Sequence, residues 1–303
     1  MLNIRNYQDI DFNGVQMLMN RSNEFDSFSW SLLREKLYGD PDWNPSRTWI
    51  AELDGQIVGF MLGVTRNIRG TNYGYIKLMG VEPSVRRKKI ATQLFSTLES
   101  QFIQEGMDIF RIYDVPLNYY MPGIDPRYTP AICFAQKMGF THFGDSVNMQ
   151  VDLNDRDWEV SPQLEQLKKE DISIYRATVE DKPELFGFIS TEWALWQNEL
   201  EMAYRSKPVS IHIARYKGKI KAFSAYDGNN QGTGWFGPMG THPDLRGKGI
   251  GTILLYLCLN DIKKQGLISA TIPWVAPISF YSHYANAKID RVFWRFEKKL
   301  TNV

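Results

Sequence analysis

The segment from Gly240 to Thr252 combines residue types that bind anions. It places the cations Arg246 and Lys248 among three glycines, directly before the apolar run 253–257. The apolar run predicts a helix whose first amides have no partner and whose N-terminal end is partly positive. Glycines let that backbone approach a ligand closely, so the segment predicts a phosphate site. Its spacing matches neither the dinucleotide fingerprint Gly-x-Gly-x-x-Gly nor a Walker loop.

A weaker copy of this segment, Gly80 to Thr92, lies 160 residues upstream, so that Arg86 corresponds to Arg246. Lys89 stands in the place of Gly249, and Ala91 in the place of Gly251. Repetition at one fixed step predicts a duplicated domain.

The expected elements around the two copies repeat in the same order. The first half is predicted to contain strands at 2–5, 48–53, 56–61, 75–79, 108–113 and 147–152 and helices at 14–19, 90–103 and 131–138. The second half is predicted to contain strands at 172–176, 211–216, 219–226, 235–239, 268–272 and 292–297 and helices at 182–193, from the turn to about 264, and at 278–285. The Asp54-Gly55 and Lys217-Gly218 pairs predict hairpins. This order predicts two α/β (α+β) domains, each with a mixed, mostly antiparallel sheet flanked by helices.

The length of 303 residues suits two domains of about 150 residues each. We predict an N-terminal domain at 1–153 and a C-terminal domain at 172–303. The polar segment 154–171, which includes Asp155-Arg156-Asp157 and a charged run from Lys168 to Asp171, is predicted to be a linker.

Composition narrows the class of protein. Basic and acidic residues nearly balance, giving a net charge of +1, so the charge expected of a general nucleic-acid binder is missing. No apolar run reaches the length of about 18 residues that spans a membrane, and no signal peptide is apparent, so we expect a cytoplasmic protein without a membrane partner. The four histidines show no ligand spacing, and we expect no metal.

The Gly240–Thr252 segment resembles the acetyl-CoA signature of the GNAT superfamily of N-acetyltransferases, Gln/Arg-x-x-Gly-x-Gly/Ala between a central strand and the next helix. Phe280-Tyr281, on the short helix before the final strand, resembles the second motif of that family. The resemblance covers nearly the whole chain twice. It implies two tandem GNAT-like domains and acetyl-CoA as a co-substrate, with no metal.

The resemblance also implies roles for individual residues. The backbone of Met239 and Thr241 would bond pantetheine, and one backbone N–H there would meet the oxyanion. The pyrophosphate would be held by Arg246, Gly247, Lys248, Gly249, Ile250, Gly251 and Thr252. Tyr281 would protonate the leaving thiolate, a transfer that is uphill by about 1.5 pKa units between an ordinary tyrosine and a thiol. The alternative is that Tyr281 only packs on the cofactor or bonds to it.

The general base remains open. Some family members carry a glutamate on the central strand, but the corresponding residues here are Trp235 and Tyr75. Ordered water, or one of Glu192, Glu199 and Glu201, would then remove the proton of the amine.

The N-terminal copy of the motif is a second cofactor-binding candidate. Its residues would be Val81, Arg86, Arg87, Lys88, Lys89, Ile90, Ala91 and Thr92. Phe134-Ala135 stands where Phe280-Tyr281 stands, so the expected catalytic tyrosine is missing, unless Tyr113, Tyr119, Tyr120 or Tyr128 replaces it.

We therefore expect the C-terminal domain to transfer an acetyl group from acetyl-CoA to an amine of a small molecule or peptide. The alternatives are catalysis in the N-terminal domain, or a non-catalytic module that binds coenzyme A for sensing or scaffolding. The sequence leaves the acceptor and the oligomeric state open.

Overall fold

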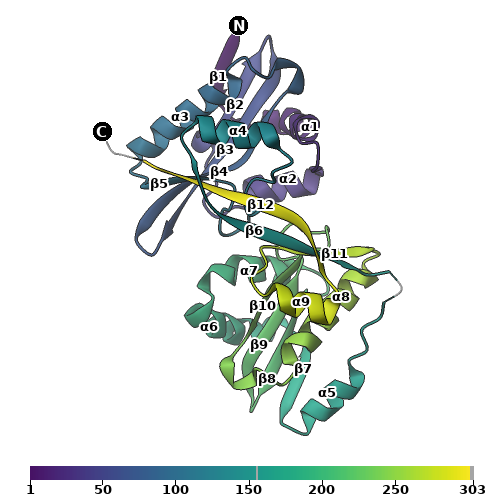
Figure 1. Ribbon diagram of the computed structural model, residues 1–303. Helices are drawn as coiled ribbons and strands as arrows, with labels where there is room; N and C mark the ends of the chain where they lie inside the picture. The colour runs from purple at the N-terminus through teal and green to yellow at the C-terminus, as the bar shows by residue number, and fades with distance from the viewer. Residues whose placement is uncertain (155, 301–303) are drawn as a thin grey trace. The chain divides into compact units, whose positions relative to one another are not determined.

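The computed structural model describes residues 1–154 and 156–300, which form two compact units (Figure 1). Unit 1 comprises residues 1–146 together with the chain from 292 onward, and unit 2 comprises residues 147–291. Asp155 of the predicted linker and residues 301–303 of the predicted C-terminal domain lie outside the described residues. Both units have the predicted mixed α/β architecture, in which mostly antiparallel strands are flanked by helices.

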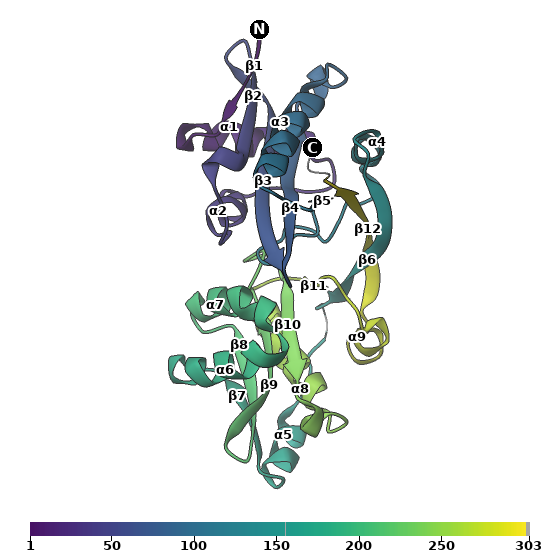
Figure 2. The same ribbon diagram turned by 90° about the vertical axis from the view of Figure 1, so that its left-hand side faces the viewer.

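Unit 1 follows the predicted order, with one helix that the sequence did not suggest, α2. Its elements are β1 (Leu2–Asn6), α1 (Phe12–Ser22), α2 (Trp30–Tyr38), β2 (Thr48–Leu53), β3 (Gln56–Ile68), β4 (Thr71–Val81), α3 (Ile90–Gln104), β5 (Ile109–Ile112) and α4 (Thr129–Lys137). Strands β1 to β4 pair antiparallel, whereas β5 pairs parallel to β4. Helices α1 and α3 pack on opposite faces of these strands (Figure 2).

Unit 2 repeats this plan around β7 to β10. Its elements are α5 (Ser161–Lys168), β7 (Ile172–Arg176), α6 (Lys182–Glu192), α7 (Gln197–Arg205), β8 (Ile211–Tyr216), β9 (Lys219–Tyr226), β10 (Phe236–Thr241), α8 (Ile250–Lys264), β11 (Ser269–Ile272) and α9 (Ile278–Ala285). The four strands pair antiparallel in the order β10-β9-β8-β7, so β10 lies at an edge. Helix α8 covers one face, and α6 and α7 cover the other (Figure 2).

The closing strands of the two sequence halves are exchanged. β12 (Lys288–Lys299), the last strand of the chain, pairs antiparallel with β5 in unit 1, with Phe296 opposite Ile112. β6 (Thr141–Asp152), the last strand of the first half, pairs with β11 in unit 2, with Val151 opposite Ala270. The compact units therefore divide the chain at different residues from the predicted domains, because these pairings carry each closing strand away from its own half.

The segment predicted as a linker contains helix α5. Val160 and Leu167 from this segment are buried against Ile250, Ile253 and Leu254 at the start of α8. Its apolar residues recur at a helical spacing that the many charges conceal. The segment therefore covers the beginning of α8 instead of only connecting two domains.

Two findings concern membranes and metal ions. No helix among the described residues is long and apolar enough to cross a membrane. The described part of the chain also contains no cluster of three or more His, Cys, Asp or Glu side chains placed to hold a metal ion.

Candidate functional site

The turn between β10 and α8 has the conformation that its glycines predict. Gly247 and Gly249 have φ values of 79° and 75°, in the left-handed region that glycine adopts without strain. Gly249 is the N-cap of α8 and offers no side chain to cap it, which leaves the amides of the first helical turn open. A methyl group added to either glycine would meet no atom within 4 Å. The turn therefore presents bare backbone donors to open space at a positive helix end.

Gly251 differs from the other two glycines. A methyl group at this position would lie 3.7 Å from the Phe280 ring, an ordinary contact. The alanine at the matching position of the upstream copy, Ala91, is thus compatible with the same local structure.

The edge of β10 that faces away from β9 is open at Met239 and Thr241, where the family resemblance implies that pantetheine would bind. His242 N–H donates to Lys221 O at 2.8 Å, so Gly240 and His242 face β9. Backbone groups alternate along an antiparallel strand, and those of Met239 and Thr241 therefore face the other way. On that side β11 reaches only as far as the isolated bridge between Trp235 and Thr271, among the residues that the structure describes.

Both predicted phosphate-binding cations contact the protein itself. Arg246 Nε donates to Thr241 O at 3.4 Å, which ties the turn to the end of β10. Lys248 Nζ lies 2.6 Å from Glu170 Oε2, just beyond α5, and this contact raises the pKa of the lysine. Both partners are well exposed, so the pair contributes little to stability and can open for an anion.

Tyr281 on α9 is buried beside the end of β11. Its ring packs edge-on against Phe236 at 6.0 Å and against Phe280 at 5.1 Å. Burial raises the pKa of Tyr281 to about 12. The hydroxyl consequently stays protonated at physiological pH and is suited to donating a hydrogen bond.

The turn of unit 1 has the same backbone path without the glycines. Arg87 and Lys89 have φ values of 69° and 62°, at the positions of Gly247 and Gly249. Both side chains are exposed. Arg86 Nε donates to Val81 O at 3.2 Å, as Arg246 does to Thr241. Sequence divergence has therefore left the shape of this turn unchanged.

One difference between the neighbourhoods of β4 and β10 concerns the residue that follows β5. Tyr113 follows β5 with a left-handed φ of 58°, and its N–H donates to Ile76 O at 2.8 Å. Its buried hydroxyl interacts with the backbone N–H of Met79, the counterpart of Met239. Burial raises the pKa of Tyr113, and the Met79 amide opposes that shift. In unit 2 the corresponding residue is Pro273, which has no side chain that could reach across in this way.

A buried charge network fastens the 116–130 insertion to unit 1. Lys77 on β4 donates to Asp40 Oδ2 at 2.5 Å and to Asn118 Oδ1 at 2.6 Å. Arg66 Nε donates to Pro116 O at 2.9 Å. Burial lowers the pKa of Lys77 to about 7. Sequence patterns did not suggest this network to us, although a lysine inside a predicted central strand is a signal for a buried ion pair.

The three glutamates considered as bases lie in different environments. Glu201 pairs with Lys182 at 2.7 Å, Glu199 is buried, and Glu192 is exposed at the end of α6. Trp193 follows Glu192 and lies over β10, since a methyl group on Gly240 would be 3.0 Å from its ring.

Comparison with known proteins was made on the sequence and on the fold. The model of the Acetyltransferase (GNAT) family matches residues 15–140 and again 157–282. No curated protein matches the sequence. Among solved structures, the fold is similar to a glucosamine N-acetyltransferase region of a fungal multi-domain β-N-acetylglucosaminidase, with a TM-score of 0.82 at 18% identity. That match covers 98% of this chain and 38% of the fungal chain.

Two further structures match along almost their entire length. A GCN5-related N-acetyltransferase from Sphaerobacter thermophilus has a TM-score of 0.70 at 16% identity, over 98% of this chain and 95% of that one. A tandem GNAT protein from the clavulanic acid biosynthesis pathway has a TM-score of 0.69 at 14% identity, over 99% and 98%.

These matches define a class of proteins in which two similar α/β units follow one another in one chain. The protein belongs to the acetyltransferase (GNAT) family, which it matches twice.

Proposed function

We propose that unit 2 transfers an acetyl group from acetyl-CoA to an amine of a small molecule or peptide. The observation that carries this proposal is the open edge of β10, which ends at the uncapped start of α8. Backbone donors and acceptors along the edge suit the amides of pantetheine, and the turn suits the pyrophosphate.

Each residue of the site has a role in this proposal. The outward backbone groups of Met239 and Thr241 hold pantetheine. The amides of Gly247 to Thr252 hold the pyrophosphate, and Lys248 adds positive charge there. Arg246 positions the turn through its bond to Thr241 O.

The chemical step joins the amine nitrogen to the acetyl carbon and breaks the carbon–sulfur bond. The outward N–H of Met239 or of Thr241 stabilises the oxyanion that develops on the thioester oxygen. Tyr281 donates its hydroxyl hydrogen toward the departing thiolate, while the amine loses a proton to water or to a carboxylate. With the pKa of Tyr281 at about 12, full proton transfer to a thiol of ordinary pKa is uphill by about 3.5 units. A hydrogen bond that strengthens as charge builds on sulfur is the role that this pKa favours.

In unit 1 we propose that Tyr113 takes the place of pantetheine. Its hydroxyl already engages Met79, the amide that the cofactor would need. Unit 1 then has the folded turn but no free strand edge, and its role is mainly structural.

The test is thiol release from acetyl-CoA across a panel of amines. The panel includes glucosamine, because the fungal region of similar fold is a glucosamine N-acetyltransferase. We expect Tyr281→Phe and Arg246→Ala to reduce turnover, and the matched variant Arg86→Ala to leave it unchanged. Loss of activity in Arg86→Ala alone would assign catalysis to unit 1. Binding of acetyl-CoA without turnover of any amine would indicate a non-catalytic module.

A further inference from the structure

Helix α9, which carries Tyr281, is short and mostly exposed. It has eight residues, and a helix of that length is not stable in water on its own hydrogen bonds. Its buried residues are Tyr281 and Ala285, which lie one turn apart on the same face. Contacts from the rest of unit 2 must therefore fix where the Tyr281 hydroxyl lies.

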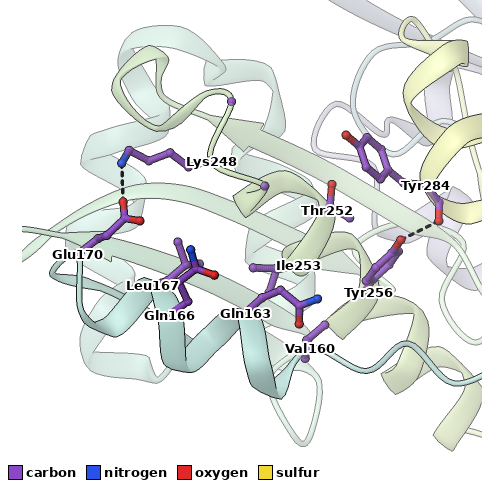
Figure 3. A pocket seen from close by; sticks show the side chains of 12 residues that line it. Val160, Gln163, Gln166, Leu167, Glu170, Lys248, Thr252, Ile253, Tyr256 and Tyr284 are labelled. Carbon is purple, nitrogen blue, oxygen red and sulfur yellow. Dashed lines mark hydrogen bonds and ion pairs between the residues drawn. The ribbon is translucent and has the colours of Figure 1, made fainter.

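Two side chains from outside α9 bind the carbonyls at its C-terminal end. Arg156 Nη1 donates to Ala285 O at 3.0 Å, and the Tyr256 hydroxyl donates to Tyr284 O at 2.9 Å (Figure 3). The last carbonyls of a helix have no partner within the helix, and they make that end partly negative. The positive charge of an arginine strengthens a hydrogen bond at this position. Arg156 is thus well suited to hold the end of α9.

The backbone around Arg156 is attached to α8. Lys263 Nζ donates to Arg156 O at 2.7 Å. Two residues further on, the N–H of Trp158 donates to Asn260 Oδ1 at 3.2 Å, and Asn260 Nδ2 donates to Trp158 O at 2.8 Å. Both Asn260 and Lys263 lie in the last turns of α8. Segment 156–158 therefore connects the end of α8 to the end of α9.

We propose that Arg156 is a positioning residue for Tyr281. Through the carbonyl of Ala285, one turn away on the same face of α9, it sets the position of the tyrosine hydroxyl relative to the departing sulfur. A misplacement of about 1 Å can lower a rate about 100-fold, so a contact far from the reacting atoms can affect catalysis. The inference rests on the proposed role of Tyr281 in unit 2, and it gives the segment expected to be a linker a part in that role.

The first experiment compares the steady-state kinetics of Arg156→Ala with those of the wild type. We expect kcat to fall about tenfold, because α9 gains freedom and the Tyr281 hydroxyl is less often in place. The KM for acetyl-CoA should change less than about twofold, because the proposed cofactor contacts lie on β10 and the turn. The control is Lys264→Ala, which removes an exposed cation from the same end of α8 and should leave both constants unchanged. An unchanged kcat in Arg156→Ala would overturn the proposal.

The conservative variant Arg156→Lys tests the contact itself. A single nitrogen of Arg156, Nη1, donates to Ala285 O, and a lysine ammonium can also make one charged contact of this kind. Arg156→Lys should therefore keep kcat within about threefold of the wild type. If its kcat is as low as that of Arg156→Ala, the positive donor at the helix end is not what places Tyr281.

A double-mutant cycle with Tyr281→Phe tests whether Arg156 acts through the tyrosine. Phenylalanine has no hydroxyl to position, so adding Arg156→Ala to Tyr281→Phe should lower kcat by less than about twofold. An equal loss in both backgrounds would show that Arg156 acts independently of Tyr281, and the positioning role would be wrong.

Hydrogen exchange in α9 separates this inference from the proposed function, because it needs no turnover. In Arg156→Ala the amides of 282–287 should exchange about fivefold faster than in the wild type, since one end of the helix is released. Faster exchange in a protein that acetylates no amine would support the hold of Arg156 on α9 and contradict the acetyltransferase proposal. Turnover that is lowered by Tyr281→Phe, with neither turnover nor exchange altered by Arg156→Ala, would overturn the positioning role and leave the acetyltransferase proposal intact.

Discussion

Lys89 and Gly249 adopt the same left-handed backbone conformation, although only one of them is a glycine. A side chain with a Cβ atom incurs a steric penalty in this region, on the order of 1 kcal/mol. Unit 1 keeps the shape of the turn at that cost, because its helix and strand fix the two ends of the turn. The two turns have the same backbone shape, so the larger difference between the units is the side chain after β5 and β11, which is Tyr113 in unit 1 and Pro273 in unit 2.

Lys89→Gly is therefore expected to stabilise the protein. Relief of the left-handed strain, partly offset by the greater freedom of glycine in the unfolded chain, predicts a gain in unfolding free energy of up to about 1 kcal/mol. Denaturant unfolding would measure it. The neighbouring Lys88 lies outside the left-handed region, so Lys88→Gly should destabilise. Equal effects of the two substitutions would contradict this account.

The raised pKa of Tyr281 predicts the pH dependence of catalysis. Below a pKa of about 12 the hydroxyl remains protonated, so the proton-donating form is present throughout the range of an ordinary assay. Tyr281→Phe should lower kcat about 100-fold. The factor should be the same at every pH from about 6 to 10. The rise of the rate with pH should persist in the variant, because it belongs to the amine. Disappearance of that rise in Tyr281→Phe would show that the tyrosine itself titrates.

At the scale of elements, the strand–turn–helix unit is where sequence and structure agree best. The sequence predicted β10, α8 and the turn between them, because glycines, cations and an apolar run follow one another directly. It missed α2, α5 and α7, and in α5 charged residues obscure the apolar spacing. It also gave no indication that Tyr113 turns toward Met79, which depends on a left-handed residue after β5. Local patterns predict elements well, whereas a side chain's path across a strand edge depends on tertiary contacts.

The turn provides a matched pair of substitutions for cofactor binding. Gly249→Ala forces a Cβ onto a residue with φ of 75° and into the space proposed for phosphate, so acetyl-CoA affinity should fall at least about tenfold. Gly251→Ala places its methyl against Phe280 at 3.7 Å and should change affinity by less than about threefold. Calorimetric titration of both variants would show whether the glycines act through backbone conformation. Similar losses in both would argue that they do not.

For the whole molecule, the two units predict the stoichiometry of binding. If Tyr113 occupies the place of pantetheine in unit 1, the chain should bind one acetyl-CoA. Tyr113→Gly suits the φ of 58° and removes the obstructing ring, so it should create a second, weaker site. Titration of both proteins would decide between one site and two. Two equal sites in the wild type would refute the role of Tyr113.

The exchange of β6 and β12 has a consequence for how such a chain can be divided. A cut between β6 and β7 would leave β5 without the strand that covers it, and β6 without β11. The unpaired N–H and C=O groups of an uncovered sheet edge can form hydrogen bonds with a strand of another chain. Two copies of a single half could each supply the closing strand that the other lacks, in a strand-swapped dimer with two-fold symmetry. The tandem chain thus has the connectivity of such a dimer whose two subunits have been joined end to end and have since diverged.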